Sequence, residues 1–166
     1  GVDQPNATGC VLAALDAAHS LDRNLRVTVV LGAHAPWLEQ VRAQVAHMRL
    51  PVRLLVDTRE MASILCESDL VIGAAGGSAW ERCCLGVPSL LVVVAENQRS
   101  GARLLHELGA ASILGDAPVA DERVVEELNR LCVDAGELVR MSLRAREIVD
   151  GHGAQRVAQE MLTSYA

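Results

Sequence analysis

The chain has 166 residues, 51% of them hydrophobic, which is enough for one globular domain with a full core. Acidic residues outnumber basic ones by 21 to 15, and this net charge of -6, with only two Trp, one Tyr and no Phe, argues against nucleic acid as a partner. All 15 basic residues are arginine, which excludes sites that need a lysine, such as a Walker-type phosphate loop or a Schiff base.

Helical and strand-like segments alternate in the hydrophobic pattern along the whole chain. Helices are expected at residues 6–21, 36–48, 59–67, 78–85 and 97–108, with two or three more from residue 121 onward. Strands are expected at residues 26–31, 52–56, 70–73, 89–94 and, more weakly, 111–114. This order predicts an α/β fold whose Rossmann-like parallel sheet carries helices on both faces and binds ligands at the carboxyl ends of its strands.

The first residues form a polar loop, GVDQPNATG, that leads directly into the first expected helix. A sheet of this kind normally begins with a strand, so we expect the first strand to be lacking and no strand to precede Asn6. The sheet would then have an unfilled place or take a strand from a neighbour. Within the loop, Asp3 and Asn6 are residue types that form Asx turns and helix caps.

The most informative segment is residues 69–98, which predict a strand, a glycine loop, a helix, a second strand and a second loop. Gly76 and Gly77 would let a ligand approach the backbone, and a helix starting at Ser78 would offer free N–H groups and its positive dipole end to a phosphate. The same residues also fit a capping box, in which Ser78 caps the helix and Glu81 bonds back to the Ser78 N–H. Both interpretations stay open, while the glycine spacing excludes a GxGxxG dinucleotide fingerprint.

Three arginines, Arg82, Arg99 and Arg103, fall near the two loops. They could offset phosphate charge, although solvated helix arginines are the commoner outcome. The sequence has no DxD pattern and no cluster of His, Cys and carboxylates, so we expect no metal and no other cofactor. Five cysteines without CxxC spacing, an opening unlike a signal peptide and the lack of a membrane-length apolar stretch predict a cytoplasmic protein without membrane insertion.

The run DTREMASILCESDLVIGAAGGSAWERCCLGVPSLLVVVAENQ, followed by LLHELGAASIL, resembles the nucleotide-sugar-binding half of the GT-B glycosyltransferase superfamily. Within it, the chain is most similar to the UDP-sugar hydrolases of pseudaminic acid biosynthesis, which release UDP from UDP-2,4-diacetamido-2,4,6-trideoxy-β-L-altropyranose. The opening GVDQPNATG and the later DGHGAQRVA also resemble that family, so the similarity runs nearly end to end. The lipid II-forming N-acetylglucosaminyl transferases are similar more distantly.

The resemblance implies a UDP-sugar site around the glycine loop. Gly76, Gly77 and Ser78 fall on the family's diphosphate-binding loop. Glu81 matches the family glutamate that accepts hydrogen bonds from the ribose hydroxyls, a role that suits a carboxylate. One carboxylate oxygen could serve the ribose while the other serves a cap.

Three further loops belong to the implied site. Their residues are Asp3 and Asn6, Asp57 and Thr58, and Asn97 and Gln98. In the family, the first loop faces the phosphates and sugar across an interdomain cleft, the second lies against uracil largely through backbone groups, and the third turns amides toward the sugar or phosphate. The alternatives are turn and cap roles for the first loop and a helix cap by Asn97 for the third.

The implied reaction is attack by water on the anomeric carbon of a UDP-sugar, with a histidine base in an N-terminal domain that this chain does not contain. We therefore expect residues 1–166 to form one UDP-sugar-binding domain that is catalytically silent alone. Its partners would be UDP or a UDP-sugar and the N-terminal domain, and an exposed interdomain face could also form a homodimer. The alternatives are the donor-binding domain of a UDP-sugar-dependent glycosyltransferase and a non-catalytic module of the same fold.

Overall fold

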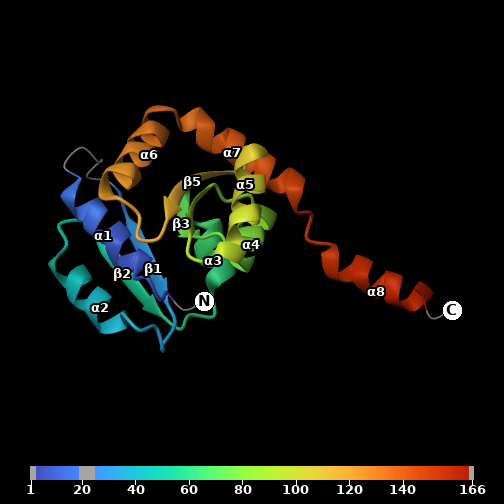
Figure 1. Cartoon of the computed structure of the whole chain (residues 1–166), viewed down its shortest axis with the longest axis horizontal. Coiled ribbons are helices and arrows are strands. Elements are labelled where there is room, and N and C mark those ends of the chain that lie inside the picture. The colour runs from blue at the N-terminus through green and yellow to red at the C-terminus, as the bar shows by residue number, and fades with distance from the viewer. Residues whose placement is uncertain (1–2, 19–24, 165–166) are drawn as a thin grey trace.

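The computed structural model describes residues 3–18 and 25–164, in which helices and strands alternate as predicted (Figure 1). The helices are α1 Ala7–Ala17, α2 Leu38–His47, α3 Met61–Cys66, α4 Gly77–Leu85, the 3-10 turn η1 Glu96–Gln98, α5 Arg99–Glu107, α6 Asp121–Val133, α7 Ala135–Ile148 and α8 Gly153–Ser164. The strands are β1 Val27–Leu31, β2 Val52–Val56, β3 Val71–Ala74, β4 Ser89–Val93 and β5 Ala111–Asp116. The first helix ends earlier than expected, at Ala17, and residues 19–24, on which its predicted end falls, lie outside the described part.

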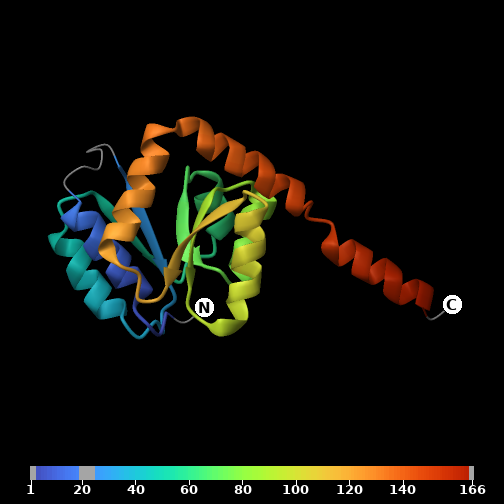
Figure 2. The same cartoon turned by 45° about the horizontal axis from the view of Figure 1, so that its top comes forward.

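The strands form two parallel sheets rather than the single sheet that we expected. β1 pairs with β2, and a second sheet has the order β3-β4-β5. Two views show β1 between β2 and the second sheet, so hydrogen bonding is interrupted between β1 and β3 (Figure 1, Figure 2). No strand precedes α1 in described residues 3–6.

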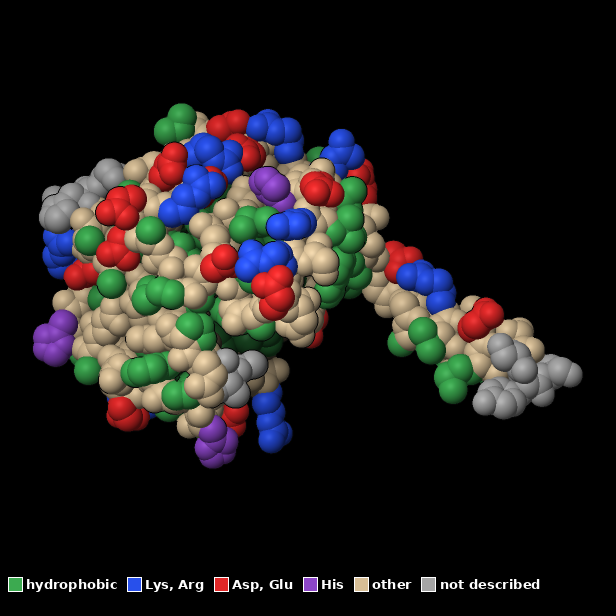
Figure 3. Space-filling view, in the orientation of Figure 1, with side chains coloured by type: hydrophobic (Ala, Val, Ile, Leu, Met, Phe, Trp, Pro, Cys, Tyr) green, Lys and Arg blue, Asp and Glu red, His purple; other side chains and the backbone are tan. Residues whose placement is uncertain are grey.

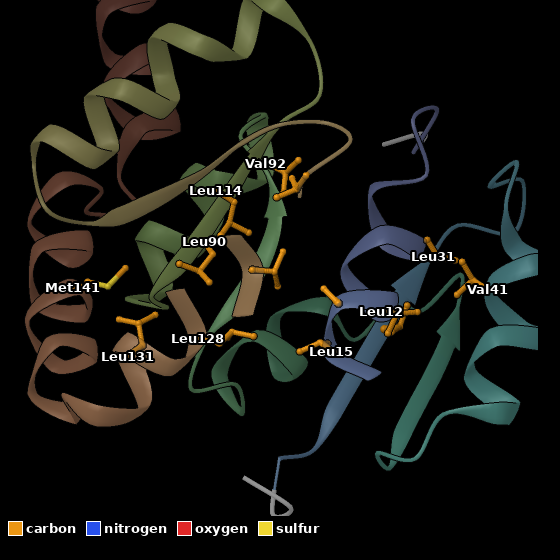
Figure 4. Packing of buried hydrophobic residues seen from close by; sticks show 14 residues of the cluster. Leu12, Leu15, Leu31, Val41, Leu90, Val92, Leu114, Leu128, Leu131 and Met141 are labelled. Atoms are coloured by element: carbon orange, nitrogen blue, oxygen red, sulfur yellow. The ribbon is translucent and has the colours of Figure 1, made fainter. Parts of the chain in front are cut away.

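Strand β4 is the centre of the second sheet, and all five of its residues are buried. Successive side chains of a strand point to opposite faces. Leu90 and Val92 join a cluster with side chains of α1, α6 and β1 (Figure 4). Leu91 and Val93 join a different cluster with side chains of α4, α5 and α7. Helices thus cover both faces of β4, as its continuous apolar run predicts for a parallel strand.

The cluster that contains Leu90 also holds the two sheets together. Its members include Leu31 of β1, Leu12 of α1 and Leu128 of α6 (Figure 4). Helices α1 and α6 pack directly against each other. Side-chain packing therefore joins the sheets where hydrogen bonds between strands do not.

The chain ends in three helices, within the expected two or three. Helix α7 packs on α4, whereas α8 stands away from the body (Figure 1, Figure 2). Hydrophobic side chains lie along one side of α8, among them the exposed Val157, Met161 and Leu162 (Figure 3). An amphipathic helix with its apolar side uncovered offers a surface for contact. None of the helices in residues 3–18 and 25–164 is long and apolar enough to cross a membrane.

Candidate functional site

The loop between β3 and α4 leads into a helix start that no side chain caps. The backbone of Gly76 precedes α4 in an extended conformation, at φ -87° and ψ -157°. Within the described residues, the backbone N–H groups of Gly77 and Ser78 meet no acceptor. Unpaired N–H groups at the positive end of a helix dipole form an anion-binding position.

The capping box of Ser78 and Glu81, one of the two interpretations left open by the sequence, is not present. Ser78 is the second residue of α4 rather than its cap, and its hydroxyl accepts a hydrogen bond from Nη1 of Arg82 at 3.2 Å. Glu81 is exposed on the same helix. This interpretation is wrong because Gly76, a residue type also found at N-caps, starts the helix before the serine. The Glu81 carboxylate is therefore open to solvent instead of folded back onto the helix start.

Arg82 lies beneath the glycine loop, and the expectation that it is solvated is wrong. Its relative exposure is 4%. Nε donates to Oγ of Ser89 at 2.9 Å, and Nη2 donates to the carbonyl oxygen of Ala74 at 3.0 Å. Burial lowers the pKa of the guanidinium, because a low-dielectric surrounding disfavours the charged form, yet an arginine stays protonated at neutral pH. One charged side chain therefore ties α4 to the end of β3 and the start of β4.

The loop after β4 meets the glycine loop through Gln98. Its Oε1 accepts a hydrogen bond from the Val94 N–H at 3.2 Å, and a Cβ placed on Gly76 would lie 3.3 Å from its Nε2. The amide nitrogen therefore sits beside the Gly76 backbone. Asn97 is exposed within η1, and α5 starts after Gln98 without a side-chain cap, so the predicted cap by Asn97 is wrong.

The polar side chains of the opening loop form hydrogen bonds with the start of α1. The two carboxylate oxygens of Asp3 accept hydrogen bonds from the N–H groups of Ala7 and Thr8, each at 2.8 Å. Oδ1 of Asn6 accepts from the Gly9 N–H at 3.2 Å, with Asn6 itself at φ 55°. An asparagine tolerates this left-handed conformation because its side chain bonds locally. The turn and cap interpretation of Asp3 and Asn6 is confirmed.

Asp57 and Thr58 follow β2, which lies on the far side of β1 from the glycine loop (Figure 1). Asp57 is exposed at φ 54°, and its N–H donates to the carbonyl oxygen of Leu31 at 2.9 Å. The Thr58 hydroxyl accepts a hydrogen bond from the Glu60 N–H at 3.2 Å. These contacts stay within the β1–β2 half, so the structure does not join this pair to the residues around Gly76.

Of the other two arginines near the loops, Arg103 matches the expectation of a solvated side chain, whereas Arg99 is half-buried and ion-paired. Nη1 of Arg99 lies 3.0 Å from Oδ1 of Asp116 and its Nε lies 3.1 Å from Oε2 of Glu96, and the hydrogen bond that Arg99 donates to Asp116 raises the pKa of Arg99. Arg103 is exposed on α5. Two carboxylates thus pair with Arg99, whereas the ion pairs of the described residues do not include Arg82.

Two surface hollows of the described chain lie away from this edge. One is lined by α1 and α6 and another by α7, and neither contains a predicted site residue. The described residues contain no group of three or more His, Cys, Asp or Glu side chains that could hold a metal. The candidate site is therefore an open edge made of backbone N–H groups, Gln98 and the supporting Arg82.

Sequence reasoning missed Gly73 and the burial of Arg82. A Cβ on Gly73 would lie 3.2 Å from Nη1 of Arg82, so this glycine of β3 leaves the space that the guanidinium occupies. The available signal was the spacing of Ala79, Arg82 and Cys83, which puts the arginine on the buried face of α4. A charged residue on a buried face predicts hydrogen-bond partners inside the protein.

The chain matches known proteins along most of its length. The model of the glycosyltransferase family 28 C-terminal domain matches residues 9–161. The spore coat polysaccharide biosynthesis protein SpsG of Bacillus subtilis (strain 168) is 32% identical over 151 residues, covering 89% of this chain and 43% of that protein. The UDP-N-acetylglucosamine--N-acetylmuramyl-(pentapeptide) pyrophosphoryl-undecaprenol N-acetylglucosamine transferase of Aromatoleum aromaticum is 33% identical over 144 residues, covering 84% of this chain and 40% of that protein.

A solved structure shares the fold. The crystal structure of MurG from Acinetobacter baumannii matches with a TM-score of 0.75 at 23% identity, covering 93% of this chain and 44% of that chain. The α/β architecture, with parallel sheets flanked by helices, is that of one Rossmann-like half of a GT-B fold. The chain spans about two fifths of the length of the curated relatives described above.

Proposed function

The chain belongs to the glycosyltransferase family 28 C-terminal domain family, and we propose that it is the nucleotide-sugar-binding domain of a UDP-sugar-dependent glycosyltransferase. The observation that carries this proposal is the uncapped start of α4. Its two unpaired N–H groups, the Gln98 amide and the charge of Arg82 converge on one edge of the sheet. A diphosphate matches this arrangement, because it offers several negatively charged acceptor oxygens.

Each part of the nucleotide sugar has a proposed partner around this edge. Gly76, Gly77 and Ser78 would hold the diphosphate through backbone N–H groups, and Gln98 would donate from Nε2 to the phosphate or the sugar. The exposed Glu81 carboxylate would accept hydrogen bonds from the ribose hydroxyls. The diphosphate therefore takes the charged helix start, and the ribose lies further along α4.

The remaining predicted residues have less direct proposed roles. Asn97 is exposed beside Gln98 and would face the sugar. Asp57 and Thr58 would shape a loop whose backbone groups recognise uracil. Because the side chains of Asp3 and Asn6 already bond to α1, we assign them to the shape of the opening loop and not to contact with phosphate.

The relatives favour sugar transfer over release of the sugar to water. The Aromatoleum relative is named as an N-acetylglucosamine transferase, and the Bacillus relative as a polysaccharide biosynthesis protein. No contact at the described edge favours the hydrolysis implied by the resemblance to the pseudaminic acid pathway enzymes. Transfer to an acceptor is therefore the proposed reaction of the whole protein.

We assign an N-terminal domain of the same protein as the partner that completes the site. The chain spans only about two fifths of the length of the curated relatives, and the described edge is open on one side. The exposed apolar side of α8 offers such a domain a surface to contact (Figure 3). The same surface could join two copies of the chain, and sedimentation over a range of concentrations would detect such a homodimer.

Calorimetric titration of the chain with UDP, UMP and ADP tests the proposed site. We expect UDP to bind more tightly than UMP, because UDP fills the whole diphosphate position, and more tightly than ADP, because the uracil loop rejects a purine. Glu81→Ala should weaken UDP binding by about 10-fold, the loss expected for hydrogen bonds to a charged group. Glu107→Ala, which removes an exposed glutamate at the far end of α5, is the matched control. A wild-type chain that binds none of the three nucleotides would instead support a non-catalytic module.

The whole protein distinguishes transfer from hydrolysis. UDP release from a UDP-sugar would be followed with and without a lipid-linked or polysaccharide acceptor. Release that depends on the acceptor supports the transferase. Release at the same rate without any acceptor, with free sugar as the product, supports the hydrolase instead.

A further inference from the structure

Arg82 is a buried cation without a carboxylate partner. It is only 4% exposed, and the ion pairs formed by residues 3–18 and 25–164 do not include it. Its three nitrogen atoms donate to neutral oxygens, namely the hydroxyls of Ser78 and Ser89 and the carbonyl of Ala74. Placing a charge in a protein interior without a counter-ion is unfavourable, because the charge loses its hydration. A negative charge supplied by another molecule would offset that loss.

The guanidinium lies directly behind the open start of α4. Nη2 bonds to Ala74, the last residue of β3, and Nη1 bonds to Ser78, whose own N–H is unpaired. Gly77 and Ser78 are exposed, so the buried guanidinium contacts a residue, Ser78, whose backbone an anion can reach from solvent. Gly73 leaves the room for this placement, since a Cβ there would lie 3.2 Å from Nη1.

The nearest carboxylate in sequence does not neutralise this charge. Glu81 precedes Arg82 directly, and its charge opposes the lowering of the Arg82 pKa by burial without cancelling it; Glu81 is exposed, and the described residues show no ion pair between the two. Arg99 shows the contrast, because two carboxylates lie within 3.1 Å of it. The charge of Arg82 therefore stays available to a ligand on the other side of the loop.

We propose that Arg82 is a positioning residue for the diphosphate, and that the bound diphosphate is its counter-ion. The inference rests on the proposed function. Through Ser78, Ser89 and Ala74 the side chain fixes the two strands and the helix start as one unit, so the unpaired N–H groups are held in place before the ligand arrives. Its field acts through protein rather than water and is screened less than that of a surface arginine.

Binding of ligands that do or do not carry phosphate tests this role. Wild type, Arg82→Met and the control Arg103→Met, which alters an exposed arginine of α5, would be titrated with UDP, inorganic pyrophosphate and uridine. For Arg82→Met we expect the affinity for UDP and pyrophosphate to fall by about 10- to 100-fold, while the affinity for uridine is unchanged. Arg103→Met should bind all three ligands as the wild type does.

A purely structural role for Arg82 would give a different pattern. Equal losses for UDP and uridine, or unchanged UDP affinity in a folded Arg82→Met protein, would overturn the proposal. Where Arg82→Met does not fold, Arg82→Lys and Gly73→Ala replace it. Arg82→Lys keeps the charge but loses the several donor nitrogens of the guanidinium. In Gly73→Ala, the added methyl group displaces Nη1 of Arg82. Each variant should therefore weaken the binding of pyrophosphate and leave the binding of uridine unchanged.

The two levels of the proposal fail in distinguishable ways. A wild-type chain that binds neither UDP nor pyrophosphate overturns the proposed function and the role of Arg82 with it. A wild-type chain that binds both, with pyrophosphate affinity unchanged in the Arg82 and Gly73 variants, overturns the role of Arg82 alone.

Discussion

Two helix starts of this domain satisfy their backbone N–H groups in opposite ways. At α1, the carboxylate of Asp3 and the amide of Asn6 accept hydrogen bonds from three successive N–H groups. At α4, Gly76 has no side chain to do so, and the N–H groups of Gly77 and Ser78 meet no acceptor in the described residues. The negative charge of Asp3 fills the position that the dipole of α1 offers to an anion. A ligand phosphate is therefore expected at α4 and not at α1.

The side chains that connect the two helix starts to neighbouring elements also differ in charge. At α1, neutral side chains make the connections, since Nε1 of Trp37 donates to the carbonyl oxygen of Gln4 and Nε2 of Gln44 donates to that of Gly9. At α4, the charged guanidinium of Arg82 makes them. The capped start of α1 thus carries a negative charge, that of Asp3, on its free N–H groups. The uncapped start of α4 instead has a positive charge, that of Arg82, on its buried side. An anion-binding loop is thus recognised by the missing cap and the buried cation more than by glycine alone.

Giving α4 a cap like that of α1 should have the largest effect on binding. In Gly76→Asp, the backbone at φ -87° and ψ -157° suits an L residue, and the flexible Gln98 side chain near the new Cβ can move. The carboxylate would accept from the free N–H groups and repel the diphosphate. We expect the free energy of unfolding to rise by about 1 kcal/mol, while UDP affinity falls by about 100-fold. Urea unfolding and calorimetry measure the two effects.

Gly76→Asn is the matched control for this substitution, because it offers the same cap without the charge. It should stabilise α4 to a similar degree and lose less UDP affinity than Gly76→Asp does. UDP binding that is as tight in Gly76→Asp as in the wild type would contradict the assignment of the diphosphate to α4.

Removing the cap of α1 should have a smaller effect, which lowers the stability of the domain and leaves UDP binding unchanged. Asp3→Ala removes the acceptor of two hydrogen bonds of 2.8 Å, so we expect the free energy of urea unfolding to fall by about 1 to 2 kcal/mol. Gln4→Ala is the control, since Gln4 is exposed and its contact with Trp37 uses the backbone carbonyl. A loss of UDP affinity in Asp3→Ala comparable to that in Glu81→Ala would show instead that Asp3 contacts the ligand.

Residue type and spacing predicted the α1 start correctly and the α4 start incorrectly, for a physical reason. Asp3 and Asn6 bond to N–H groups only a few residues away, so the local sequence contains all the partners. At α4 the sequence holds two competing starts, Gly76 and Ser78. The choice between them depends on Arg82, which engages the Ser78 hydroxyl and is itself fixed by Ser89 on the next strand.

The order of the elements was also predictable, because apolar periodicity reports helices and strands directly. The acceptors of Arg82 could not be predicted, since Ala74 and Ser89 reach it only through the pairing of β3 with β4. Local patterns thus predicted the fold, and contacts between elements decided the chemistry of the edge.

A third helix start, at α8, shows a carboxylate in a fully exposed setting. Oδ1 of Asp150 accepts a hydrogen bond from the His152 N–H at 3.0 Å, and Nη1 of Arg156 donates to Oδ2 of Asp150 at 2.6 Å. The hydrogen bond from Arg156 holds the pKa of the Asp150 carboxyl well below its usual range. Because the folded-state pKa is depressed, the contribution of Asp150 is present above the unfolded-state pKa of about 4 and is lost as the pH falls through the folded value.

The contribution of Asp150 to stability should be the smallest of the three effects. The Asp150–Arg156 pair is exposed to solvent, and α8 stands away from the body (Figure 2). We expect the NMR signals of the His152 and Arg156 amides in the wild type to shift only when the pH falls well below about 4, where an ordinary aspartate titrates, and we expect no such shift in Asp150→Asn. The urea midpoint of the body should be the same in both proteins at neutral pH, because both side chains of the pair are exposed to solvent. A clear change in that midpoint would mean that α8 unfolds together with the body. The cap at the start of α8 would then contribute to the stability of the whole domain, although α8 does not cover a sheet.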